Sequence, residues 1–127
     1  MLESADVSFV ERLDDRTAAE VMRWVTGGPD NEFWVLPEPP AGMASVFRMP
    51  VTRWRPTRDS FCRQLLVEEL RSRGLIVEVE ETRTAEGFEY LCTIAPSADD
   101  PPTVSVRAPT AGLAVVCAAL ASAGGAV

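Results

Sequence analysis

The sequence contains no histidine, and all 12 of its basic residues are arginine because lysine is absent as well. Without imidazole the chain lacks the usual general base near neutral pH, which excludes a Ser/His or Cys/His nucleophile. Without lysine it has neither a Schiff-base amine nor a Walker lysine, and it has no glycine-rich phosphate loop. We therefore expect a binding protein with no catalytic residues, no metal ligands and no cofactor.

Cysteine is scarce, and the spacing of the cysteines indicates no disulfide bonds. The three cysteines, Cys62, Cys92 and Cys117, are an odd number and lie far apart. This pattern suits neither a disulfide framework nor a paired-cysteine zinc site. Their apolar neighbours favour reduced thiols that pack as small hydrophobic side chains. The alternative, a nucleophilic cysteine, needs a nearby base or a strong positive field.

Long hydrophobic runs are also missing. The most apolar stretch, Leu113 to Ala123, is rich in alanine and too short to span a bilayer, so we expect a buried helix there and no membrane partner. The first six residues carry two acids and none of the basic and apolar regions of a secretory signal. A chain of 127 residues fits one domain, so residues 1–127 are expected to form a single α+β domain in the cytoplasm.

Charge is unevenly distributed along the chain. The net charge of −7 argues against non-specific nucleic-acid binding, which depends on many cations that neutralise phosphates. Between Arg48 and Arg73, however, seven arginines and three acids leave a net of +4. A cationic contact surface, if the chain has one, is expected in this segment.

The first half of the chain predicts two helices separated by short strands. Ser8 to Glu11 has the form of a capping box, and an apolar stripe from Phe9 to Val25 predicts a helix that ends before Gly27. Residues 33–36 and 46–49 are typical of short strands, the second closed by Pro50. A second helix is expected from Thr57, as its N-cap, to residue 73. Its expected buried side is Phe61, Cys62, Leu65, Leu66 and Leu70.

The second half predicts three strands and a last helix. Residues 75–81 alternate, with Leu75, Val77 and Val79 on one face, and 88–94 repeat the alternation, which favours a hairpin. A third strand is expected at 103–107, followed by a helix over 111–123 capped by Thr110. The predicted order is α-β-β-α-β-β-β-α, an α+β fold with a mainly antiparallel sheet packed between helices.

Three stretches resemble one known family. They are residues 13–24 with Leu13-Asp14 and an Ala, Val-Met and Trp pattern, residues 54–59 with a Pro, Thr and Asp entry to a helix, and the closing helix at 108–120. Together they are similar to the phage ABA sandwich domain family of small phage and prophage proteins. Here Arg58 stands between Thr57 and Asp59, a departure from the family pattern. The resemblance implies an ABA-sandwich-like fold and a phage origin in a host cytoplasm, with no assigned activity.

The candidate ligand-binding residues are Arg53, Trp54, Arg55, Thr57 and Arg58, at the start of the second helix. Arginines beside a helix N-terminus are mildly unfavourable unless an anion shares the site. Backbone donors together with guanidinium groups could bind phosphate or carboxylate, and a tryptophan ring could offer a stacking face. The alternative is that acids such as Asp59 and Glu38 neutralise these arginines and leave a solvated rim.

Two classes of function remain open from the sequence. The first is a non-catalytic phage or prophage accessory protein, expected to be a homo-oligomer, that binds a host or phage protein. The second is a trap for an anionic, nucleotide-type signalling molecule. Carboxylates at Glu78, Glu80 and Glu89 share a strand face, and Asp14-Asp15 lie near the first helix, but no spacing fixes them as a metal or glycosidase pair.

Overall fold

The computed structural model describes residues 2–37 and 47–124, with side chains described from residue 9 onward. Within these ranges the chain forms three α-helices and two three-stranded antiparallel sheets, which confirms the α+β class. One sheet has the order β1-β2-β3 and the other the order β4-β5-β6. Strand β1 of the small sheet was not predicted. The prediction described one sheet, whereas the structure divides the strands between two.

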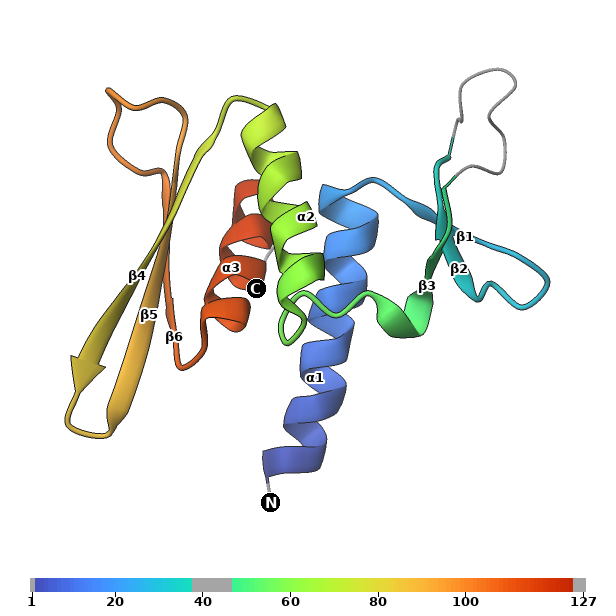
Figure 1. The fold of residues 1–127 in the computed structure, drawn as a ribbon, viewed down its shortest axis with the longest axis horizontal. Coiled ribbons are helices and arrows are strands. Elements are labelled where there is room, and N and C mark those ends of the chain that lie inside the picture. Colours follow the sequence, from blue (N-terminus) through green and yellow to red (C-terminus); the bar gives the residue numbers. More distant parts are fainter. Residues whose placement is uncertain (1, 38–46, 125–127) are drawn as a thin grey trace.

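The helices lie between the two sheets (Figure 1). Helix α3 (Ala111–Ser122) packs directly on strands β5 (Gly87–Ala95) and β6 (Val104–Ala108). Helices α1 (Leu2–Arg16) and α2 (Ser60–Ser72) pack on α3 from the side away from that sheet, and α2 also reaches strand β4 (Ile76–Thr84). The small sheet, β1 (Val25–Gly27), β2 (Phe33–Val35) and β3 (Met49–Pro50), lies at the opposite end of the molecule.

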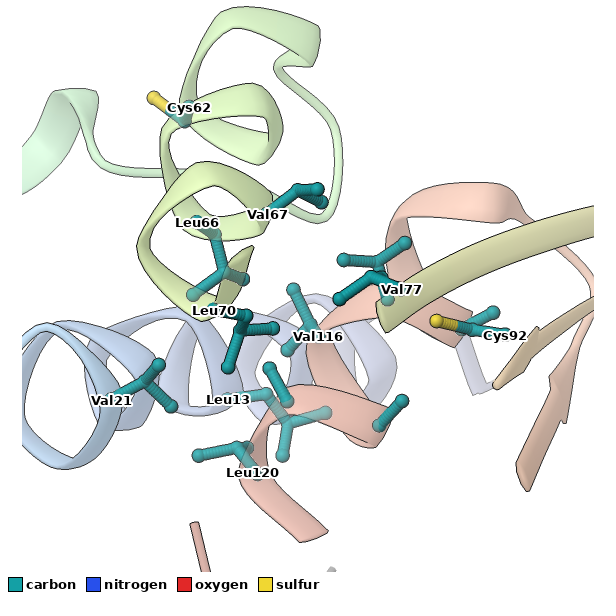
Figure 2. Close-up of a cluster of buried hydrophobic side chains, with 14 of the residues drawn as sticks. Leu13, Val21, Cys62, Leu66, Val67, Leu70, Val77, Cys92, Val116 and Leu120 are labelled. Atoms are coloured by element: carbon teal, nitrogen blue, oxygen red, sulfur yellow. The ribbon is translucent and has the colours of Figure 1, made fainter. Parts of the chain in front are cut away.

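The hydrophobic core is centred on α3. Because its residues are mostly alanine and valine, neighbouring elements can approach it on nearly every side, and seven of its 12 residues are buried. Figure 2 shows Val116 and Leu120 of α3 meeting side chains from the other helices and from the large sheet. The labelled contributors are Leu13, Val21, Cys62, Leu66, Val67, Leu70, Val77 and Cys92.

Helix α1 differs at both ends from the sequence prediction. It begins at Leu2, so the predicted capping box at Ser8 lies inside the helix and that start is wrong. The α-helix ends at Arg16 and continues as one π-helical turn, Thr17–Val21, in which the Met22 N–H donates to the Thr17 carbonyl. Arg23 then has φ of 64°, and this left-handed residue turns the chain into β1 before Val25 could extend the helix.

The small sheet partly matches the prediction. Strand β2 lies where 33–36 were expected, and Trp34 is buried in it. The second predicted strand began at residue 46, which lies outside the described residues; the observed strand is Met49–Pro50, so Pro50 pairs with Phe33 instead of closing the strand. As an edge strand, β3 tolerates a proline because its missing N–H can face away from the ladder.

Helix α2 begins later than predicted. Its N-cap is Asp59, whose carboxylate accepts hydrogen bonds from the N–H groups of Phe61 and Cys62, so the assignment of Thr57 as the cap is wrong. Phe61, expected in the buried side, is 66% exposed, whereas Cys62, Leu66 and Leu70 are buried as predicted. The last turn ends at Gly74 with φ of 85°, as the glycine predicted.

The large sheet and α3 agree with the predicted pattern. Strands β4 and β5 form a hairpin in which Val77 faces Ile94 and Val79 faces Cys92, which puts the predicted alternating apolar residues on one face. Strand β6 pairs with β5 from Val104↔Ile94 to Ala108↔Tyr90. Helix α3 is capped by the Thr110 hydroxyl, which accepts from the Leu113 N–H at 3.1 Å, as predicted.

Candidate functional site

The segment 53–59 connects a 3-10 turn, Val51–Arg53, to helix α2, and buried polar contacts with α1 hold it in place. The carboxylate of Asp14 accepts two hydrogen bonds from Thr57, from its N–H at 3.0 Å and from its hydroxyl at 2.7 Å. Asp14 has no exposed surface and Thr57 is buried. The Thr57 hydroxyl is therefore committed to Asp14, which explains why it does not cap α2.

A second buried polar chain fixes Trp54. Its indole Nε1 donates to the Thr17 hydroxyl at 2.9 Å, and that hydroxyl donates to the Asp14 carbonyl at 2.6 Å. The Trp54 ring is fully buried and meets Trp24 edge-on, with 4.8 Å between ring centroids. Trp54 therefore offers no stacking face to a ligand, and that expectation is corrected: buried tryptophans usually need a partner for the N–H, and Thr17 provides it here.

Burial dominates the electrostatics of Asp14. Loss of solvation raises its pKa from 3.8 to about 6, although the two Thr57 hydrogen bonds and the Arg55 charge act in the opposite direction. The carboxyl group titrates close to physiological pH for this reason. Because both its oxygens are bonded to Thr57 and it has no exposed surface, this group has no open access to a substrate.

The arginines of the segment are divided between internal pairing and solvent. Arg55 is only 12% exposed in its side chain; it donates to Asp15 at 3.1 Å and to the Trp54 carbonyl at 2.9 Å, and its Nε lies 4.0 Å from Glu11. Arg58, 61% exposed in its side chain, lies 3.5 Å from the same Glu11 carboxylate. Arg53 is exposed. Acids of α1 thus neutralise two of the three cations, although Glu38, the other acid considered, lies outside the described residues.

A hollow of about 540 Å³ does open at this place, lined by Thr52, Arg53, Arg55, Arg58, Asp59 and Ser60. The structure therefore brings the three predicted arginines to one hollow, whereas Trp54 and Thr57 are buried and do not line it. The Arg55 Nε is buried and has no hydrogen-bond partner. The first N–H groups of α2 are occupied by Asp59, so the helix terminus offers fewer donors to an anion than the sequence suggested.

The other chemically interesting residues do not converge. Glu78 and Glu80 lie on the outer face of the large sheet, and Glu89 pairs with Arg107 at 3.1 Å. In the described ranges, 2–37 and 47–124, no three Asp, Glu or Cys side chains are placed to hold a metal ion together. The same ranges contain no helix with the length and apolar character to cross a bilayer.

The cysteines are free, with Cys62 and Cys92 buried and Cys117 half-buried, which confirms their placement as packed thiols. Burial raises the pKa of Cys92 to about 11, and it raises the pKa values of Cys62 and Cys117 as well. A raised pKa keeps the thiol protonated at neutral pH, and the thiolate is the reactive form. The geometry therefore gives no support to a cysteine nucleophile.

Sequence reasoning missed a second surface, on the β4–β5 hairpin. The face that buries Val77, Cys92 and Ile94 continues along the hairpin to Val79 and Phe88, which are 43% and 49% exposed. Strand β6 pairs no further than Tyr90, so both strands project beyond it toward the turn. Phe88 lies in this projecting part, whereas Val79 lies opposite Cys92, where β6 still pairs, and Glu81 and Tyr90 lie between them on the same face. We call Val79 with Phe88 the hairpin patch. The signal was the unequal length of the strands, nine residues in β4 and β5 against five in β6.

Arg83 lies over the Phe88 ring, with its guanidinium carbon 5.6 Å from the ring centroid. The patch is therefore bordered by a cation on the same face of the hairpin, since Arg83 is the cross-strand neighbour of Phe88. Comparison with known proteins adds no relative from which a function could be transferred to either surface. No family model, no curated protein and no solved structure matches this chain.

Proposed function

We propose that this chain is a non-catalytic accessory protein that binds a protein partner through the hairpin patch. The observation that carries the proposal is that Phe88 is about half exposed on the part of the hairpin that projects past β6, with Val79 similarly exposed on the same sheet face. A two-stranded ribbon that projects from its sheet is marginally stable alone, and an apolar face on it gains from being covered. The resemblance of residues 13–24, 54–59 and 108–120 to the phage ABA sandwich family supports a phage or prophage origin, with action in the host cytoplasm.

The test compares two exposed phenylalanines. Tagged protein carrying Phe88→Ser, and matched protein carrying Phe61→Ser at the start of α2, are used to recover partners from phage-infected or prophage-induced cells. The recovered protein is then purified and its direct affinity is measured by calorimetry. We expect Phe88→Ser to weaken binding at least about tenfold, since one large side chain contributes on the order of 2 kcal/mol to an interface. Phe61→Ser should bind like the unchanged protein.

Equal recovery of every captured protein by the two variants would contradict the proposal. Circular dichroism and thermal unfolding of both variants provide the folding control, because Phe88 and Phe61 are both exposed and their replacement is expected to leave the core intact. If Phe88→Ser binds nothing but also unfolds at a lower temperature, the binding measurement is repeated with Val79→Thr. This replacement keeps the β-branched shape while adding a hydroxyl.

A second candidate function is the sequestration of an anionic small molecule at the arginine hollow. The observation in its favour is the buried Arg55 Nε without a hydrogen-bond partner, in a hollow that Arg53 and Arg58 also line. Thermal-shift measurements with cyclic dinucleotides and ADP-ribose derivatives test it, because a ligand that binds only the folded state raises the melting temperature. No stabilisation by any of these compounds would overturn it.

Arg53→Glu is the informative variant for this hollow. Arg55 is mostly buried and paired with Asp15, so its replacement by glutamate would place like charges together and unfold the segment. Arg53 is exposed, and Arg23→Glu, at another exposed arginine, makes the same change of charge far along the chain. If the hollow is the site, Arg53→Glu abolishes the thermal shift and Arg23→Glu preserves it.

A further inference from the structure

Strand β4 leaves one edge of the large sheet open. The Ile94 carbonyl accepts from the Thr103 N–H at 2.9 Å, so the backbone groups of Ile94 point toward β6. Backbone groups alternate in direction along a strand, and residues directly opposite in an antiparallel pair share that direction relative to the pair. The residues of β4 opposite Ile94, Cys92, Tyr90 and Phe88 therefore direct their N–H and C=O groups to the free edge. They are Val77, Val79, Glu81 and Arg83.

In the part of the chain that the structure describes, a hydrogen bond covers the first of these positions alone. Arg71, at the end of α2, donates to the Val77 carbonyl at 3.2 Å and closes that end of the edge. Among the described residues, no hydrogen bond reaches the edge groups of Val79, Glu81 and Arg83. An edge of this kind is a template for another strand, and proteins normally protect it or use it.

We infer that this edge pairs with the same edge of a second copy of the chain, antiparallel and centred on Thr82. Glu81 then lies opposite Arg83 of the second copy, and Arg83 lies opposite Glu81 of that copy. The two sheets join into one continuous six-stranded sheet across a two-fold axis. This inference goes beyond the proposed partner binding and does not depend on it.

Charge selects the register. In the joined sheet, the same face of each copy must point to the same side. Because side chains alternate between faces, this is possible only if the two-fold axis passes through a residue of β4. Placing the axis on Glu78, Glu80, Glu81 or Arg83 sets that charged residue against its own copy. Placing it on Val79 sets Glu78 against Glu80. Like charges directly opposite are destabilising, and of these positions only Thr82 brings opposite charges together instead.

The covered end of the edge favours the same register. An axis nearer the start of β4 would push the hairpin turn of the second copy over Val77, where Arg71 already binds the carbonyl. With the axis on Thr82, the turn of the second copy reaches only as far as Val79. Glu81 and Arg83 both point to the edge, so they exchange roughly four main-chain hydrogen bonds across the axis. Such a short interface predicts a weak dimer that dissociates on dilution and at high salt.

Charge reversal tests the pairing on the full-length protein. Sedimentation equilibrium at low salt, from micromolar to millimolar protein, gives the dimer dissociation constant. We expect Glu81→Arg and Arg83→Glu each to raise this constant at least about tenfold, because each sets like charges opposite. The double variant, Glu81→Arg with Arg83→Glu, should restore it to within about threefold, since the charges are merely exchanged. Glu68→Arg on α2 is the control and should change nothing.

A monomer throughout the concentration range, or a double variant as weak as the single ones, would overturn the inference. The axis position has its own test, Thr82→Cys, since a residue on the axis faces its own copy at about 4.5 Å between Cα atoms, close enough for a disulfide. We expect Thr82→Cys to form a covalent dimer under mild oxidation and the control Thr84→Cys to form little. Equal cross-linking of the two would overturn the register. Because these residues differ from Phe88, failure here leaves the partner-binding test unaffected.

Discussion

At the scale of single residues, Asp14 contributes to how stability depends on pH. Its pKa is about 6 in the folded protein against an ordinary value of 3.8, so the folded chain holds this proton more tightly than the unfolded chain does. The contribution of Asp14 to the free energy of unfolding is therefore complete below about pH 4 and is lost as the pH rises through 6. A shift of this size corresponds to about 3 kcal/mol.

Asp14→Asn removes the titration while keeping an acceptor for the Thr57 N–H. Its free energy of unfolding, minus that of the unchanged protein, should rise by about 2 kcal/mol between pH 4 and pH 7, measured by urea unfolding. Asp14→Ala provides the comparison: it leaves the buried Thr57 N–H and hydroxyl without a partner and should destabilise the protein by roughly 2–4 kcal/mol. A difference between the Asn variant and the unchanged protein that is flat with pH would contradict the role of Asp14.

The sequence located the arginine cluster along the chain, but it did not predict which side chains of this segment are buried. Arg53, Arg55 and Arg58 line one hollow, as their proximity along the chain suggested. The pairing of Arg55 with Asp15, and of Thr57 with Asp14, joins residues about 40 positions apart. Neither local propensity nor charge pattern contains that information, because it depends on how α1 packs beside the entry to α2. The same packing buries Trp54 and removes it from any ligand surface.

At the scale of elements, the N-terminus of α2 depends on Asp59. Its carboxylate accepts from the Phe61 N–H at 2.8 Å and lies 3.4 Å from the Cys62 nitrogen. Asp59→Ala should destabilise the protein by about 1 kcal/mol, the usual cost of losing an N-cap. Asp59→Asn should recover most of that loss, because the amide oxygen can accept the same bonds. Thermal unfolding measures both, and an Asn variant as unstable as the Ala variant would contradict the capping role.

The close approach of α3 to the segment before α2 depends on Gly112. A Cβ at this position would lie 1.9 Å from the Thr57 carbonyl oxygen, a distance that requires backbone to move. Gly112→Ala should therefore destabilise the protein by several kcal/mol, although glycine to alanine in an ordinary helix stabilises it by about 1 kcal/mol. Urea unfolding measures whether Gly112→Ala lowers or raises the free energy of unfolding. A stabilised variant would show that the contact between Gly112 and the Thr57 carbonyl is not tight.

Element types followed from the sequence better than element ends did. The alternation in 75–94, the Thr110 cap and the glycine after α2 predicted the hairpin, α3 and the end of α2 because these signals act locally. The end of α1 was wrong because the stripe from Phe9 to Val25 has helical spacing, whereas the chain leaves the helix through a π-helical turn and a left-handed Arg23. Phe61 has the spacing of a buried residue but lies at the first turn of α2, where none of the described elements buries it.

At the scale of the whole molecule, buried tryptophans link the small sheet to the core: Trp34 from β2, and Trp24, which directly precedes β1. Trp24, 7% exposed, lies 4.7 Å from Phe47 and 4.8 Å from Trp54 between ring centroids. Strands β1, β2 and β3 are two or three residues long, too short to be stable by themselves. Their order therefore depends on packing against the core, to which Trp24 contributes together with Trp34.

Trp24→Ala should loosen the small sheet without unfolding the rest. Removing the indole leaves a cavity beside Trp54, and we expect a loss of about 3 kcal/mol in the free energy of unfolding. Amide hydrogen exchange resolves where the loss appears: protection should fall in β1 and β2 and persist in β5 and α3, because Trp24 directly precedes β1 and contacts Phe47 and Trp54, whereas β5 and α3 pack on each other. Equal loss of protection in both sheets would show instead that the molecule unfolds as one cooperative unit, with the aromatic cluster as part of a single core.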